Sequence, residues 1–123
     1  MAGENFAALL GTTLVNVEAD RAVVKLPYKE SLGIGRIHGG AISALADIAA
    51  TAAFWSHPSI KPTAMGATVG FTINFLKLAV GVDLTATAEV RRRGGTLCTG
   101  NVVIEDDQGN EIAIAVFTYK LTS

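Results

Sequence analysis

The sequence of 123 residues contains one cysteine and few charged residues. Cys98 has no partner for an internal disulfide, and the first 15 residues lack the basic segment and long apolar segment of a signal peptide. A formal net charge of -1 provides no basic field to attract nucleic acid or an anionic membrane surface. We therefore expect a cytoplasmic protein that binds neither nucleic acid nor a membrane.

Charged residues make up 17% of the chain, which is below the roughly 25% typical of soluble domains. The hydrophobic content of 50% is sufficient for the core of one domain spanning residues 1–123. Because few charges are available for the surface, more surface than usual is expected to be hidden, around a central element or between subunits. Oligomerisation is therefore a candidate property.

Local patterns divide the chain into a hairpin, a long helix and a run of later strands. Two β-rich runs within residues 13–27 predict the hairpin, and an apolar helix over residues 41–55 is expected to end before Pro58 and Pro62. Four strand-like segments follow, separated by turns rich in Gly and Asp. Without alternating strand and helix units, this order predicts an α+β fold in which one helix packs on an antiparallel sheet.

The predicted helix carries a narrow polar stripe. Between Ala41 and Trp55 its polar side chains are Ser43, Asp47 and Thr51, and their spacing of four places them on one face. A helix that is apolar nearly all round is normally buried, and an ionised carboxylate in a core is costly without partners. Asp47 is therefore either a structural group, at a partly wet edge or bonded to Thr51, or a functional one.

A His-Gly-Gly sequence stands at the start of this helix. The first amides of a helix have no partner within it, and glycine leaves them sterically bare. With the helix dipole, Gly39 and Gly40 could hold a carbonyl oxygen or an oxyanion, unless they serve only a tight turn. Together with the carboxylate of Asp47, they provide what acyl hydrolysis requires: donors that polarise a carbonyl and a base or nucleophile.

Cofactor and metal motifs are not expected. The segment 33–40 resembles a dinucleotide fingerprint, but the third glycine is missing and no acidic residue follows about 20 positions later. His38, Asp47 and His57 lack the spacing of metal ligands. We therefore predict neither a cofactor nor a metal site.

The stretch "GRIHGGAISALADIAATAAF" (35–54) resembles the hotdog-fold acyl-CoA thioesterases of the 4-hydroxybenzoyl-CoA and phenylacetate-degradation type. Their signature is His-Gly-Gly followed by a leucine, a small residue and an acid on a long helix. Residues 72–119 also resemble the sheet region of that family. The resemblance implies a long central helix wrapped by an antiparallel sheet, hydrolysis of an acyl- or aryl-CoA, and assembly as a homodimer or a pair of dimers.

The resemblance also implies roles for the residues of the motif. Asp47 takes the position of the acid that activates water as a base or attacks the thioester as a nucleophile through a mixed anhydride. Gly39 takes the position of the amide that binds the thioester oxygen, with His38 and Gly40 supporting it. Both routes for the acid remain open.

Further positions concern water and substrate. Thr51 matches a hydroxyl that some members of the family use to position water. Thr68 matches a hydroxyl that other members use. Many relatives carry Asn or Gln six residues before the histidine, where this chain has Leu32 beside Ser31. Either Ser31 substitutes, backbone donors act alone, or activity is weak. Arg92 falls on the buried phase of its strand pattern and could reach a phosphate of coenzyme A.

Two alternatives remain, a non-catalytic acyl-CoA-binding hotdog protein and an enoyl-thioester hydratase or dehydratase. A carrier-protein thioester is as compatible with the motif as a CoA thioester. The spacing of Gly39 and Asp47, about 12 Å along one helix, is too long for both to act on one carbonyl. A homodimer with sites shared between subunits is therefore expected.

Overall fold

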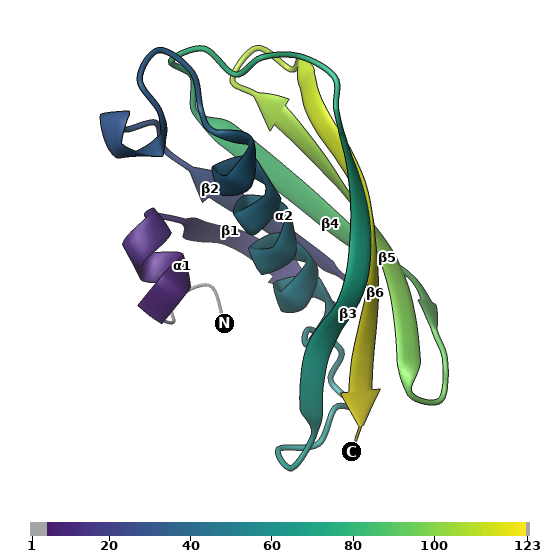
Figure 1. Ribbon diagram of the computed structural model, residues 1–123. Coiled ribbons are helices and arrows are strands. Elements are labelled where there is room, and N and C mark those ends of the chain that lie inside the picture. The colour runs from purple at the N-terminus through teal and green to yellow at the C-terminus, as the bar shows by residue number, and fades with distance from the viewer. Residues whose placement is uncertain (1–4, 123) are drawn as a thin grey trace.

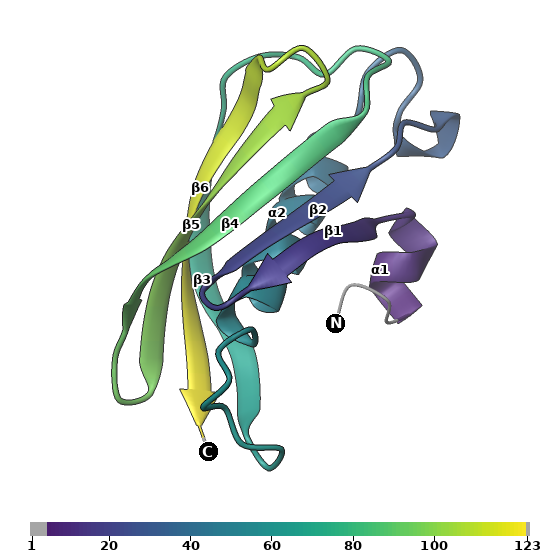
Figure 2. The same ribbon diagram turned by 180° about the vertical axis from the view of Figure 1, so that it is seen from behind.

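The chain forms one antiparallel sheet that wraps around one long helix (Figures 1 and 2). The computed structural model describes residues 5–122. A short helix, α1 (Asn5–Leu10), precedes the sheet, and the long helix α2 (Gly39–Phe54) packs on one face of it. The predicted α+β fold is confirmed. The six strands are β1 (Thr13–Glu18), β2 (Arg21–Leu26), β3 (Met65–Phe75), β4 (Leu84–Arg93), β5 (Leu97–Asp106) and β6 (Glu111–Thr122), and they lie in the order β1-β2-β4-β5-β6-β3.

The hairpin and the long helix lie where the sequence predicts them. Strands β1 and β2 pair antiparallel, and their turn places Asp20 at a φ of 67°, a left-handed conformation that Asp tolerates better than most residues. Helix α2 ends at Phe54, before Pro58 and Pro62. Turn chemistry and proline therefore set the limits of both elements.

The core lies between α2 and the sheet. The helix contacts all six strands, most extensively β2 and β4. Its inner face is rich in alanine, whose small side chain allows the helix axis to lie close to the sheet. Phe54 fills the space near the end of α2 and stacks on Tyr119 of β6, with ring centroids 4.9 Å apart. The buried residues of α2 are Ile42, Leu45, Ala46, Ala49, Ala50, Ala52, Ala53 and Phe54.

Strand β4 shows where the predicted alternation ends. Alternate residues from Leu84 to Ala88 are buried as expected. Between Val90 and Arg92 the pairing with β5 shifts by one residue, which is a β-bulge. Arg92 is consequently exposed, so the prediction that it continues the buried phase is wrong. Arg93 turns to the inner side instead and donates a hydrogen bond to the carbonyl of Phe54 at 3.0 Å.

Strand β3 forms one edge of the sheet. It pairs with β6 on one side, and its other side carries no strand in the sheet order. Val69, Phe71 and Phe75 are exposed apolar side chains on this strand. A long apolar edge strand is a surface that proteins usually cover or pair.

Candidate functional site

Helix α2 begins with a histidine cap. The Nδ1 atom of His38 accepts a hydrogen bond from the amide of Gly40 at 2.9 Å. The amide of His38 in turn donates to the carbonyl of Leu32 at 2.7 Å, which ties the preceding loop to the helix start. The Gly40 amide is therefore already occupied within the chain.

The amide of Gly39 is in a different state. None of the hydrogen bonds found within residues 5–122 uses it, although it lies at the positive end of the helix dipole. A Cβ built on Gly39 would lie 3.4 Å from Cζ of Phe75, so the aromatic ring packs over this residue. Glycine thus keeps a free donor accessible beside an apolar wall.

This donor opens onto a cavity of about 270 Å³. The walls are the loop before α2, the first turn of α2 and the segment that begins at Phe75. The amide of Ile37 donates to the carbonyl of Ala79 at 2.8 Å and joins two of these walls. The charged side chains of the lining are Arg36 and Lys77, which are both exposed. The cavity is therefore mostly apolar, with a free amide and two cations.

Asp47 lies farther along α2, on the side that faces β3. Ser43, Asp47 and Thr51 are all partly exposed, and β3 is the last strand on that side of the sheet. The hydroxyl Oγ1 of Thr68 on β3 donates to Oδ1 of Asp47 at 2.6 Å. The carboxylate is thus at the partly wet edge considered above, with Thr68 rather than Thr51 as its partner.

The two parts of the site are separated within one chain. Gly39 and Asp47 belong to the same helix, eight residues apart, which corresponds to about 12 Å of helical rise. Thr68 lies beside Asp47, and Phe75 lies beside Gly39. We call these two places along α2 and β3 the Gly39 half-site and the Asp47 half-site.

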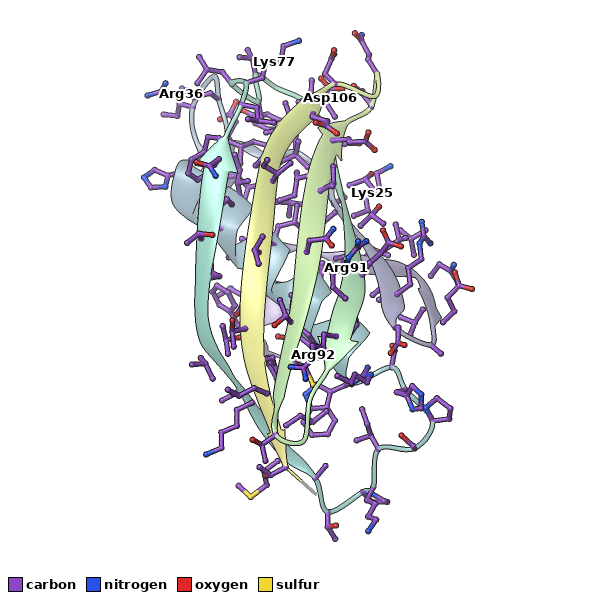
Figure 3. The ribbon with its side chains drawn as sticks, turned by 90° about the vertical axis from the view of Figure 1, so that its right-hand side faces the viewer. Lys25, Arg36, Lys77, Arg91, Arg92 and Asp106 are labelled. Carbon is purple, nitrogen blue, oxygen red and sulfur yellow. The ribbon has the colours of Figure 1, made fainter. Side chains whose placement is uncertain are left out.

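Three further predicted residues lie outside both half-sites. Ser31 is exposed, whereas the side chain of Leu32 is packed into the core at 5% exposure. Arg92 lies near the β4–β5 hairpin, toward the opposite end of the sheet from Arg36 and Lys77 (Figure 3). The structure does not bring these three side chains to the Gly39 cavity within one protomer.

The sequence alone did not identify Arg36, Phe75 or Lys77 as parts of the cavity. Arg36 lies two residues before the first residue of the His-Gly-Gly motif, which was a usable signal. Phe75 and Lys77 reach the helix start because β3 lies at the sheet edge and its following segment crosses the end of the sheet (Figure 1). No local pattern in the sequence predicts that this segment crosses the end of the sheet.

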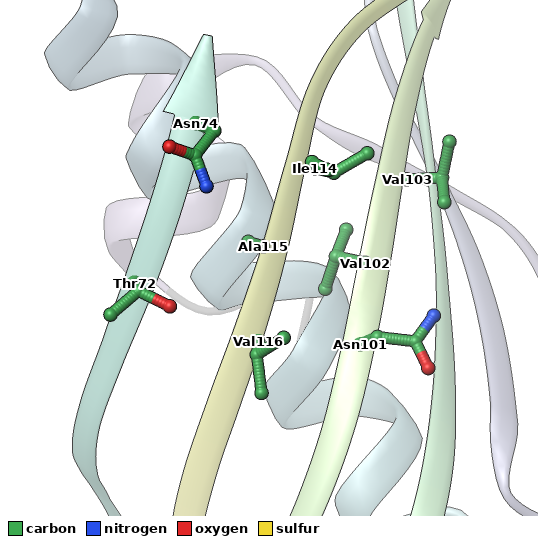
Figure 4. Close-up of a pocket in the computed structure, with 8 residues that line it drawn as sticks. All are labelled: Thr72, Asn74, Asn101, Val102, Val103, Ile114, Ala115 and Val116. Atoms are coloured by element: carbon green, nitrogen blue, oxygen red, sulfur yellow. The ribbon is translucent and has the colours of Figure 1, made fainter.

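A second hollow lies on the face of the sheet that points away from α2 (Figure 4). It has a volume of about 230 Å³ and is formed by β3, β5 and β6. Its lining consists of aliphatic side chains with Thr72, Asn74 and Asn101, and it includes no ionisable group. This groove offers no acid or base, so the cavity at Gly39 is the better candidate for chemistry.

Within residues 5–122, no helix combines the length and the apolar character needed to cross a membrane. In that range, no three His, Cys, Asp or Glu side chains gather closely enough to hold a metal ion.

Comparisons with known proteins bear on the family and the fold of this chain. Residues 34–113 match the family model of the thioesterase superfamily. A predicted esterase of Saccharolobus solfataricus is 30% identical over 109 residues, which cover 87% of this chain and 76% of that protein. The E. coli PaaI protein from the phenylacetic acid degradation operon superposes with a TM-score of 0.88 at 26% identity, covering 98% of this chain and 86% of PaaI.

A thioesterase family protein from Silicibacter pomeroyi gives a TM-score of 0.89 at 28% identity, covering 98% of this chain and 90% of that one. These superpositions extend over nearly the whole chain, including the long helix and the sheet. The hotdog fold implied by the sequence is thus confirmed.

Proposed function

Because the chain belongs to the thioesterase superfamily, we propose that it is an acyl-CoA thioesterase that hydrolyses the thioester of an acyl- or aryl-CoA. The observation that carries this proposal is the free Gly39 amide, which opens onto an apolar cavity at the start of α2. In the proposed reaction this amide holds the thioester oxygen and stabilises the oxyanion that forms on it. His38 supports the same geometry by holding the Gly40 amide.

Asp47 supplies the second half of the chemistry. As a base, it takes a proton from water while the water oxygen attacks the carbonyl carbon; the C–S bond then breaks and the thiolate leaves. As a nucleophile, its carboxylate oxygen attacks the carbonyl and displaces the thiolate, and water hydrolyses the resulting anhydride. The bond from Thr68 orients the carboxylate in both routes. Thr51 lies one turn farther along the same helix, and in this proposal its hydroxyl binds the water.

The proposed site is shared between two copies of the chain. Within one copy, about 12 Å separates Gly39 from Asp47, whereas the reacting atoms of a productive complex lie about 3–3.5 Å apart. The unpaired apolar edge of β3 supports pairing with a second copy, because such an edge is otherwise an aggregation surface. A two-fold dimer then contains two equivalent sites. A pair of such dimers is also compatible with the low charge of the chain.

The contacts of β3 suggest where the two-fold axis passes. Thr68 marks the Asp47 half-site on this strand, and Phe75 marks the Gly39 half-site. Antiparallel pairing of two β3 strands places residue 75 of one copy opposite residue 68 of the other when the axis lies midway, near residues 71–72. The same operation brings Gly39 of one subunit toward Asp47 of its partner.

A panel of acyl-CoA and aryl-CoA thioesters tests the proposal, with a thiol reagent that detects free coenzyme A. Hydrolysis releases the thiol and the free acid in equal amounts. A change at the double bond of an enoyl-CoA without thiol release would instead identify a hydratase. Binding of several acyl-CoAs without release of thiol from any of them would overturn the proposal.

One observation favours a second candidate, a non-catalytic acyl-CoA-binding protein. Leu32 occupies the position where many relatives carry Asn or Gln, and its side chain is buried in the core. It therefore cannot polarise a carbonyl. The carbonyl of Leu32 accepts a hydrogen bond from the amide of His38. The Gly39 amide therefore has no help from a polar side chain at position 32.

A further inference from the structure

Two cations share the cavity with the Gly39 amide, and we infer that Arg36 and Lys77 bind a phosphate on the thiol arm of the substrate. This inference rests on the proposed thioester site. A phosphate is found on that arm both in coenzyme A and in the phosphopantetheine of a carrier protein. The two side chains would therefore select phosphorylated thiols over simple ones.

The placement of the two residues carries the argument. Arg36 comes from the loop before α2, and Lys77 comes from the segment after β3, so the cavity receives one cation from each of two walls. A hydrogen bond between Ile37 and Ala79 joins these walls. Ile37 follows Arg36 directly in the chain, and Ala79 lies two residues after Lys77. Figure 3 shows Arg36 and Lys77 at the same end of the molecule. The distance between the two walls is thus fixed by the backbone.

The charges around the cavity leave these cations available. Neither Arg36 nor Lys77 takes part in an ion pair found in the described chain. Asp106 is an acidic group near Lys77, but its carboxylate accepts hydrogen bonds from the amides of Gln108 and Asn110 at 2.9 Å. A phosphate would be a stronger partner, since its oxygens accept several charge-assisted hydrogen bonds.

The remaining lining fits the uncharged part of such an arm. Ile42, Phe75 and Leu78 add apolar side chains to the lining of the same cavity. The phosphate lies on the thiol that leaves and does not change during the reaction. Binding it should therefore stabilise the ground state and the transition state equally, which lowers KM and leaves kcat unchanged.

The test uses one acyl group on three thiols: coenzyme A, 4′-phosphopantetheine and pantetheine, which has no phosphate. In Arg36→Gln and in Lys77→Gln, we expect KM for acyl-CoA to rise about tenfold with kcat unchanged. KM for acyl-pantetheine should not move. Arg91→Gln, an exposed arginine of β4, is the matched control for loss of one positive charge. Arg92→Gln tests the earlier expectation that Arg92 reaches the phosphate.

The inference is overturned if Arg36→Gln and Lys77→Gln change all three thioesters equally, change none of them, or have no more effect than Arg91→Gln. An effect shared by the CoA and phosphopantetheine thioesters assigns the cations to the phosphate that carrier proteins also present. An effect confined to the CoA thioester assigns the cations to the nucleotide phosphates, which only coenzyme A carries, and hence to a CoA substrate and not a carrier protein.

Measuring the binding of coenzyme A and of pantetheine by calorimetry distinguishes a failure of this inference from a failure of the proposed function. If the protein hydrolyses none of the thioesters but binds coenzyme A in an Arg36-dependent way, the proposed hydrolysis fails and the phosphate site stands. If wild-type protein binds coenzyme A no more tightly than pantetheine, the phosphate site is wrong whether or not the protein is a hydrolase.

Discussion

The hydroxyl of Thr68 donates a hydrogen bond to Oδ1 of Asp47 at 2.6 Å and links the edge strand β3 to helix α2. It is a contact between residues 21 positions apart in the chain. Oδ2 of Asp47 accepts no hydrogen bond among those found in residues 5–122. One carboxylate oxygen is thus held in place, while the other is available for proton transfer or attack.

Asp47→Asn should remove nearly all hydrolysis while leaving the fold intact. The amide has almost the volume of the carboxylate and can still accept the bond from Thr68, but it is neither a base nor a nucleophile. We expect turnover to fall at least about 10²-fold. Steady-state kinetics on an acyl-CoA measure this loss, and circular dichroism checks the fold. Near-full turnover in the folded variant would make Asp47 a structural residue only.

Thr68→Val should reduce kcat about tenfold, because the isosteric side chain no longer holds Oδ1 of Asp47. KM should change little, since binding of the substrate in the ground state does not depend on this hydrogen bond. Thr68→Ser retains the hydroxyl and should recover most of the rate. Equal kcat in the Val and Ser variants would show that the hydrogen bond does not position the carboxylate.

Features set by local chemistry were predictable from the sequence. The first hairpin follows from a turn at Ala19 and Asp20, and the end of α2 follows from Pro58 and Pro62. The polar stripe on α2 follows from the four-residue spacing that includes Asp47. In each of these cases the determining residues are near neighbours along the chain.

Features set by strand order were not predictable. Asp47 is partly exposed because β3 lies at the edge of the sheet, and only the pairing of β3 with β6 establishes that position. The cavity wall at Phe75 and Lys77 depends on the same strand order. The exposure of Arg92 depends on one bulge in the pairing of β4 with β5. Each of these facts requires partners that are distant in the sequence.

His38→Ala should impair hydrolysis less than Asp47→Asn, because His38 caps the start of α2 and we assign the proton transfer to Asp47. Loss of the cap on the Gly40 amide should cost about 1 kcal/mol of folding stability. His38→Asn, which retains a cap acceptor, should recover most of that stability. Thermal unfolding and the pH dependence of kcat/KM measure the two effects. A bell-shaped profile whose histidine-like limb disappears in His38→Ala would contradict this role.

The β5–β6 turn should weaken in acid because of Asp106. Loss of water around the carboxyl raises the pKa of Asp106, whereas hydrogen bonds from Asn110 and Gln108 and the charge of Lys77 lower it. The net effect is a pKa below the ordinary value of 3.8. Because the folded pKa is the lower one, the ionised group stabilises the fold above the unfolded pKa. That stability is lost as the pH falls through the folded pKa.

The corresponding variant is Asp106→Ala, with the exposed neighbour Asp107→Ala as its control. Asp106→Ala should lower Tm near neutral pH, and the difference from wild type should shrink as the pH drops below about 4. Thermal unfolding over a pH series measures both variants. A difference for Asp106→Ala that is the same at every pH would show that the charge of Asp106 contributes nothing to the turn.

Complementation between two inactive variants tests whether the site is shared. In Gly39→Val the side chain would press against the ring of Phe75 and cover the amide, since even a Cβ at this position would lie 3.4 Å from that ring. Asp47→Asn lacks the carboxylate. When the two variants are unfolded, mixed equally and refolded, random pairing should make about half of the dimers mixed. Each mixed dimer contains one intact site of two, so about one quarter of wild-type activity should return.

Refolded wild-type protein sets the reference for this recovery, and each variant refolded alone sets the background. Mixed dimers can be counted independently by giving one variant an affinity tag. If tagged and untagged chains pair but the mixture is no more active than either parent, Gly39 and Asp47 act within one subunit. The pairing of β3 strands near residues 71–72 would then be wrong, because its consequence is that the Gly39 half-site of one copy faces the Asp47 half-site of the other.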